Sequence, residues 1–262
     1  MENQMKQLQY TLFISAALLL ASCNKWLDVQ PRSQVEDTEL FETESGYKEA
    51  LAGVYSSMVS SKTYAKEMTY GFIGVLGQEW DFYYAAQYDD AAAYKYEASF
   101  PTSTLRNIWA NSYSGIANVN NLIAHIDDNQ NLFSPDNHDI IKGEAYALRA
   151  FLHFDLLRCF GVSYAVNPDH PAIPYCTALS YRVSPQLTVR QVVESVKEDL
   201  RQAEALLKES DPIVTGREIT ESTDKGYLLH RQLHLNYYAV RGLQARVLMW
   251  CGEYDGALAA AE

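Results

Sequence analysis

The sequence predicts an all-α protein built from tetratricopeptide-like helix pairs that long irregular loops connect. Three observations carry this prediction. Apolar residues recur at helical spacing through several long segments. Four prolines, Pro168, Pro171, Pro174 and Pro185, fall within one connection, 161–187, which they make irregular. No segment resembles a strand as strongly, although the alternating residues around 171–183 indicate brief pairing.

The first four helices are predicted from apolar residues that return every three or four positions. Residues 43–59 show this most continuously, with the face Tyr47, Ala50, Leu51, Val54, Tyr55, Met58 and Val59. The same spacing predicts helices over about 64–78, 104–127 and 138–160. Gly161 follows the fourth helix directly and predicts a left-handed cap there.

The fifth helix has the clearest start signal. Thr188 is a capping residue, and Gln191 three positions later completes a capping box. Leu187 is placed to pack against Val192 as a hydrophobic staple. The apolar pattern continues to Leu207, and a polar loop follows from Glu209.

A helix pair over about 236–251 and 255–262 carries a repeat signature. Its residues have the spacing of a tetratricopeptide pair: Ala245, Leu248, Gly252, Tyr254, Ala257 and Ala261. Small alanines let the two helices approach closely, and Gly252 makes the turn between them.

Charge and composition exclude several classes of protein. The chain has 262 residues, with 33 Asp and Glu against 21 Lys and Arg, so its formal charge is −12. Nucleic-acid phosphates would repel such a chain, so no nucleic-acid partner is expected. The hydrophobic fraction of 48% is that of a globular protein. No apolar run reaches 18 residues, so a transmembrane bundle is not expected.

The N-terminus has the pattern of an exported lipoprotein. Lys6 precedes a mostly apolar run over 11–22, which is too short to span a bilayer and ends in small residues. The sequence Leu20-Ala21-Ser22-Cys23 matches the lipobox, in which the signal 1–22 is removed and Cys23 is acylated. The alternative is an ordinary secretory signal followed by a chance cysteine. Two or more acyl chains would anchor the protein stably in a membrane.

The remaining cysteines do not indicate a disulfide framework or a metal site. Cys159, Cys176 and Cys251 are an odd number, and no C-x-x-C occurs. Cys159 and Cys251 lie in apolar helical segments, where buried free thiols are expected.

Several stretches taken together resemble the SusD/RagB-like family of outer-membrane nutrient-binding lipoproteins. They are residues 23–28 after the signal, 46–55, 148–161 and 239–257, the residues Trp109, Tyr113, Ile116 and Asn120, and Glu198-Asp199-Leu200 with Ala203. The resemblance implies an α-helical fold and no catalysis or cofactor. It also implies a lipid-anchored protein, exposed on the outer membrane, that captures glycans or other nutrients for a TonB-dependent (SusC-like) transporter.

Family members are longer than this chain. The sequence stops at Glu262, after Ala259-Ala260-Ala261, within a predicted helix. We therefore expect residues 23–262 to be an incomplete N-terminal helical region that leaves an apolar helix face uncovered.

Other chemistry has weaker support. His230 and His234 have i, i+4 spacing, but the Glu of H-E-x-x-H and a third ligand are missing, so no metal site is expected. Two pairs of acidic residues could be imagined as the carboxylates of a glycosidase, Glu79 with Asp81 and Asp89 with Asp90. We expect them to be solvated loop residues instead, because a glycosidase needs a fixed carboxylate separation that the sequence does not show.

The aromatic segment 79–96 is the candidate ligand site. Its candidate binding residues are Trp80, Asp81, Tyr83, Tyr84 and Tyr88. Aromatic faces stack on the C–H faces of sugars, and carboxylates accept hydrogen bonds from sugar hydroxyls. The alternative is that some of these rings pack in the core. A peptide ligand, and a protein-interaction scaffold that binds no nutrient, also remain open.

The lipobox generates a direct prediction. Cys23→Ala should move the protein from the membrane fraction to the soluble fraction, because the acyl chains that anchor it are attached through this thiol. Mass spectrometry of the wild-type protein should find Cys23 as an acylated N-terminus. A Cys23→Ala protein that stays in the membrane would contradict the prediction.

Overall fold

Helices form the regular structure of the computed structural model, which describes residues 40–79, 86–180 and 182–262. The longer helices are α3 (Glu44–Met58), α6 (Ser99–His125), α7 (Asn137–Phe160), α8 (Val189–Ser210), α10 (Tyr237–Cys251) and α11 (Tyr254–Ala261). The shorter ones are α4 (Phe72–Leu76), α5 (Asp89–Ala92) and α9 (Pro212–Thr215). These ranges contain no strand beyond an isolated antiparallel bridge between Pro171 and Thr188, so the all-α prediction is confirmed.

The predicted export signal, 1–22, and Cys23 lie outside the described residues. Among the helices that the structure does describe, none combines the length and the apolar character needed to cross a membrane.

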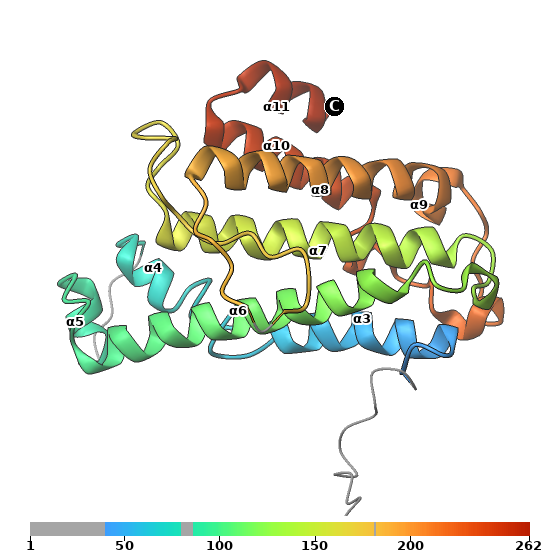
Figure 1. The fold of residues 1–262 in the computed structure, drawn as a ribbon, viewed down its shortest axis with the longest axis horizontal. Coiled ribbons are helices and arrows are strands. Elements are labelled where there is room, and N and C mark those ends of the chain that lie inside the picture. The colour runs from blue at the N-terminus through green and yellow to red at the C-terminus, as the bar shows by residue number, and fades with distance from the viewer. Residues whose placement is uncertain (1–39, 80–85, 181) are drawn as a thin grey trace, which may run out of the picture. The chain divides into compact units, whose positions relative to one another are not determined.

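The central helix of the arrangement is α7. It packs against α6 on one side and against α8 on the other, while α3 packs against α6 and α10 against α8 (Figure 1). Buried residues occupy consecutive positions of α7 from Leu152 to Leu157, which places neighbours all around the helix. At Gly143 an added Cβ would lie 2.8 Å from the Leu207 side chain, so the glycine permits the close approach of α7 and α8.

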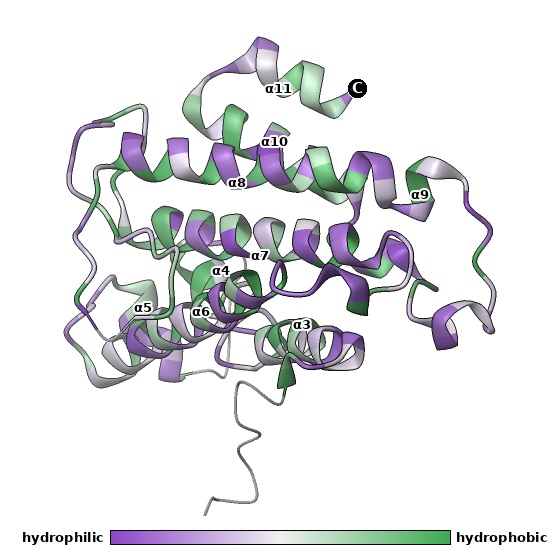
Figure 2. Ribbon diagram, turned by 45° about the vertical axis from the view of Figure 1, so that its right-hand side comes forward, coloured by the Kyte–Doolittle hydropathy of each residue, from purple (hydrophilic) through white to green (hydrophobic). Residues whose placement is uncertain are grey.

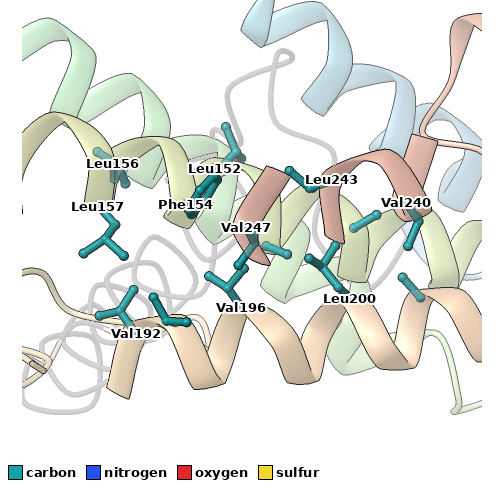
Figure 3. Close-up of a cluster of buried hydrophobic side chains, with 14 of the residues drawn as sticks. Leu152, Phe154, Leu156, Leu157, Val192, Val196, Leu200, Val240, Leu243 and Val247 are labelled. Carbon is teal, nitrogen blue, oxygen red and sulfur yellow. The ribbon is translucent and has the colours of Figure 1, made fainter. Parts of the chain in front are cut away.

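Three apolar clusters hold the helices together. The largest joins α7, α8 and α10 through side chains that converge between the three helices (Figure 3). A second joins α3, α6 and α7, and a third joins α4, α5 and α6. Hydrophobic and hydrophilic residues alternate along α8, as burial of one helix face requires (Figure 2).

The predicted helix boundaries are confirmed where capping signals define them. Thr43 caps α3, and Thr188 with Gln191 forms the predicted capping box of α8. Gly252 makes the turn between α10 and α11 with a φ of 78°, in the left-handed region that glycine favours.

The helix predicted over 64–78 is wrong in extent, because only Phe72–Leu76 is helical there. Hydroxyl groups compete for the backbone in the preceding turns. The Thr63 hydroxyl donates to the carbonyls of Met58 and Ser60, and the Thr69 hydroxyl donates to those of Tyr64 and Lys66. Short polar side chains that bond to nearby backbone in this way favour turns over a continuous helix.

Two other expectations also need correction. The helix α6 begins at Ser99, five residues before the predicted start at 104. Pro101 does not prevent this earlier start, because it lies in the first turn, where backbone amides have no intrahelical acceptor. Gly161 is extended, with φ −95° and ψ 164°, and is not the predicted left-handed cap. An added Cβ at Gly161 would lie 2.7 Å from the Leu157 carbonyl oxygen, so close packing explains this glycine.

A buried ion pair connects α7 to α8. The Nε and Nη2 atoms of Arg149 each donate to an Asp199 carboxylate oxygen at 2.7 Å, and both side chains are nearly inaccessible to solvent. Nη1 of Arg149 donates to Asn120 Oδ1 on α6 at 3.0 Å. Tyr175, in the long connection, donates its hydroxyl to Asp199 at 2.5 Å. One guanidinium therefore fixes three helices and the irregular segment beside them.

His153, one turn after Arg149 on α7, holds the same connection. Its Nδ1 donates to the Arg149 carbonyl at 2.9 Å, and its Nε2 accepts from the Cys176 amide at 3.0 Å. Its ring stacks on Tyr175, with 3.8 Å between ring centroids. Burial lowers the pKa of His153 to about 3, so the ring is neutral at physiological pH, as acceptance by Nε2 requires.

A second buried network holds the segment between α8 and α10. Glu144, fully buried on α7, contacts the guanidinium of Arg231, and Arg231 also donates to Asp211 through Nε at 3.1 Å and Nη2 at 2.8 Å. The Tyr55 hydroxyl on α3 donates to Glu144 Oε2 at 2.6 Å, and His234 Nδ1 lies 3.1 Å from the same oxygen. The irregular segment is therefore tied to α3 and α7 by charged hydrogen bonds.

Removal of Asp199 should destabilise the fold strongly. We expect Asp199→Ala to lower the free energy of unfolding by about 3–5 kcal/mol, because it leaves the Arg149 charge buried without its partner. Thermal or denaturant unfolding would measure this loss. Glu198→Ala, which removes an exposed neighbour paired with Arg201, is the matched control and should have little effect. Equal stability of the two variants would contradict the assigned role.

His153 should make stability depend on pH. In the unfolded chain this histidine takes up a proton near its usual pKa of 6.5, whereas the folded protein resists protonation until about pH 3. The free energy of unfolding should therefore fall as the pH decreases through this window, by up to about 1.4 kcal/mol per pH unit. His153→Gln should flatten that slope in urea titrations, and His170→Gln, at an exposed site, should not. A wild-type slope in His153→Gln would refute the assignment.

Candidate ligand-binding site

The described residues 86–96 of the aromatic segment contain α5 and lie next to the N-terminal end of α6 (Figure 1). Of the candidate residues of the segment, Trp80, Asp81, Tyr83 and Tyr84 lie outside the described residues, so their role in binding stays a prediction. Glu79 and the residues from Ala86 onward are described.

Tyr88 is a core residue. Only 3% of it is exposed, and its ring packs edge-on against Phe100 with 5.1 Å between centroids. Its hydroxyl lies 3.1 Å from both carboxylate oxygens of Glu67. The expectation that Tyr88 stacks on a ligand is therefore wrong for this arrangement, because the ring has no free face. Its physical role is to hold the start of α5 against α6.

Glu67 organises the polar side of this cluster. Its carboxylate is buried and accepts from the Phe72 amide at the start of α4 at 2.9 Å. Lys66 places its ammonium 3.0 Å from Glu67 and above the Tyr88 ring. Hydrogen bonds to Tyr88 and Glu67 raise the pKa of Lys66, and burial raises the pKa of Tyr88. The lysine is therefore charged and the tyrosine neutral at physiological pH.

Apolar contacts complete the support for the segment. The cluster contains Phe72 and Val75 from α4, Tyr88 and Ala91 around α5, and Ile108 from α6. Residues of α4, of the described part of the aromatic segment and of α6 thus pack into one small core.

Exposed aromatic residues follow this core. Tyr94 and Tyr96 are 46% and 47% exposed, and their ring centroids lie 6.4 Å apart. Tyr94 adopts a φ of 55°, and its hydroxyl donates to the Leu76 carbonyl at 3.1 Å. This bond fixes the Tyr94 ring while part of its surface faces solvent. Partly exposed, fixed rings of this kind are suited to stacking on a ligand.

Trp109, on α6, is a further aromatic residue at the surface. It is 36% exposed and contacts Tyr113 and Phe160, with centroid separations of 4.8 and 5.0 Å. The Tyr113 hydroxyl donates to the Pro174 carbonyl, so these rings also support the long connection. Sequence reasoning named Trp109 only as part of the family resemblance, because helical periodicity does not show which apolar ring lies at the edge of the core.

The metal site considered for His230 and His234 is not formed among the described residues. No group of three or more His, Cys, Asp or Glu side chains within them is arranged to hold a metal ion. His230 and His234 do not share a helix face, since His230 has a φ of 61° and α10 begins only at Tyr237. Cys159, Cys176 and Cys251 are free, and burial raises the pKa of the Cys159 and Cys251 thiols to about 11.

Comparison with known proteins identifies the family. The family model for SusD-like proteins, described as starch-binding associating with outer membrane, matches residues 25–217. This chain belongs to the SusD-like family. The match includes α3, α6, α7 and α8, and therefore the helices that carry the Arg149 network.

Individual relatives agree with this assignment. A SusD-like protein of Formosa agariphila is 26% identical over 216 residues, which cover 77% of this chain and 38% of that protein. A putative sugar binding protein from Bacteroides vulgatus has a similar fold, with a TM-score of 0.63 and 22% identity over 83% of this chain and 45% of its own. A SusD superfamily protein from Bacteroides thetaiotaomicron has a TM-score of 0.66 and 18% identity, over 84% and 46% of the two chains.

This SusD-like chain thus spans less than half the length of these relatives. At these identities the solved structures establish the shared fold, including the helix pairing that the repeat signature predicted.

Proposed function

We propose that this SusD-like protein is a lipid-anchored outer-membrane protein that binds a glycan and passes it to a TonB-dependent transporter. The observation that carries the proposal is the family match over residues 25–217, in a family described as starch-binding and associated with the outer membrane. The lipobox at Cys23 supports anchoring through acyl chains.

The arrangement of the aromatic segment supports glycan binding. The segment is rich in aromatic and acidic residues, and its described residues Tyr88 and Ala91 pack into a small core with α4 and α6. Within the segment, the rings of Tyr94 and Tyr96 are partly exposed, and the hydroxyl of Tyr94 is held by the Leu76 carbonyl. Sugar rings bind to such surfaces through their C–H faces, while carboxylates such as Asp81 accept hydrogen bonds from hydroxyls. This chemistry needs no cofactor and no catalytic residue.

A protein-interaction scaffold is the second candidate function. The observation that favours it is the exposure of large apolar side chains on the α10–α11 pair, namely Tyr238, Met249, Tyr254 and Leu258. Exposed apolar groups of this kind mark interaction surfaces in many proteins. Neighbouring genes would discriminate between the two functions, because an adjacent TonB-dependent transporter gene with nearby glycosidase genes supports glycan uptake.

Trp80 is the strongest single test of the glycan site. We expect Trp80→Ala to weaken binding of starch-derived or other soluble glycans several-fold, since one stacked ring contributes roughly 0.5–1.5 kcal/mol beyond burial. The melting temperature should not change. Calorimetric titration and thermal unfolding on the same full chain would measure both quantities.

Two control variants make the Trp80 result interpretable. Tyr88→Ala should lower stability by roughly 3–5 kcal/mol, as removal of a large core ring does. Tyr254→Ala, at an exposed ring on α11, should change neither affinity nor stability. A large fall in the melting temperature of Trp80→Ala, or unchanged affinity, would remove Trp80 from the site.

A further inference from the structure

A cavity of about 550 Å³ lies away from the aromatic segment. Its lining comes from the C-terminal part of α3, the following turn, α7 and the segment before α10, with the residues Ala52, Tyr55, Met58, Val59, Tyr64, Ala65, Phe151, Leu233 and His234. This volume is within the range of small-molecule sites. Val59 and Leu233 are highly exposed, so the cavity is open to solvent.

Two tyrosines form rigid apolar walls of this cavity. The Tyr55 hydroxyl donates to Glu144 and accepts from the Leu235 amide at 3.0 Å. The Tyr64 hydroxyl donates to Asp155 at 3.1 Å, and its ring contacts Phe151 with 5.3 Å between centroids. Since buried carboxylates hold the hydroxyl groups of both tyrosines, these side chains offer a ligand mainly the apolar surface of their rings. Fixed rings lose little conformational entropy when a ligand binds.

His234 is the polar group of the lining. Its Nδ1 lies 3.1 Å from the Glu144 carboxylate. Burial opposes ionisation of Glu144, but the hydrogen bond from His234 and the charge of Arg231 outweigh it and lower the carboxyl pKa. An ionised carboxylate only accepts hydrogen bonds, so Nδ1 must carry the proton. In the neutral ring Nε2 is then an acceptor, and it has no partner among the described residues.

We propose that this cavity is a second glycan subsite that binds one sugar ring. The ring's C–H face would stack on Tyr55, Tyr64 or Phe151, and a sugar hydroxyl would donate to His234 Nε2. Both features of the lining fit such a ligand, because the aromatic walls match an apolar face and the oriented acceptor matches a hydroxyl at the ring edge. The inference rests on the proposed glycan-binding function and adds a site that is separate from the segment 79–96.

The experiment is nuclear magnetic resonance of the full chain with labelled histidine. The probes are the methyl glycosides of glucose, galactose, mannose and N-acetylglucosamine, each at millimolar concentration, and phenol as a hydroxyl-bearing ring that is not a sugar. At least one methyl glycoside should shift the His234 imidazole signals. The shift should persist in Trp80→Ala, which separates this subsite from the one in the aromatic segment.

Two variants test the contacts. His234→Asn keeps an amide donor for Glu144 and removes the Nε2 acceptor, and it should weaken binding about tenfold. Ala52→Trp, at an exposed position of the lining, should fill the cavity and abolish the shift. Ser57→Trp adds the same side chain at an exposed position of α3 outside the lining, and should leave binding unchanged.

The possible failures can be told apart. If no methyl glycoside shifts His234, or if phenol alone does, the cavity is not a sugar subsite. An equal loss in Ser57→Trp and Ala52→Trp would also overturn the proposal. If the protein still binds glycans in any of these cases, and Trp80→Ala weakens that binding, the proposed function stands and only the second subsite is rejected.

Discussion

The fold depends on the pairing of Arg149 with Asp199 inside the helical layers. A charge buried on the central helix is costly to desolvate, so it is tolerated only with an opposite charge and with its hydrogen bonds satisfied. Asp199, Asn120 and the neighbouring Tyr175 meet these requirements from α8, α6 and the long connection. The same contacts define which face of each helix meets α7, and they hold an irregular segment that has no helix of its own.

Polar networks of this kind explain how long loops coexist with well-packed helices. The connection before α8 is held by His153 and Tyr175, and the segment before α10 is held by Arg231 against Glu144 and Asp211. Irregular segments offer few periodic apolar residues for packing, so charged and aromatic anchors from α7 take that role. The motif 148–161, which carried much of the family resemblance, is therefore mainly an anchoring motif.

Polar anchors also support the two candidate ligand sites. The cluster around Tyr88 and Glu67 packs the start of α5 against α4 and α6, so a ring that sequence suggested as a ligand contact supports its neighbours. The cavity beside His234 uses the Glu144 network in a comparable way, since the buried carboxylate orients both a wall and the polar group. In both places a buried carboxylate holds the hydroxyl of a tyrosine, Tyr88 at Glu67 and Tyr55 at Glu144.

The sequence by itself determined the helical class, the capped helix starts at Thr43 and Thr188, the turn at Gly252 and the family, because periodicity, capping and motif order are local properties of the chain. It proposed a candidate site in the segment 79–96 but did not separate Tyr88, a core ring, from the exposed Tyr94 and Tyr96. Only the tertiary structure decided that Thr63 and Thr69 end a predicted helix in turns, that Gly161 is extended, and that His234 meets Glu144. Burial and pairing of this kind depend on residues as far apart as Tyr55, Glu144 and Arg231, and their proximity exists only once α3, α7 and the segment before α10 have packed together.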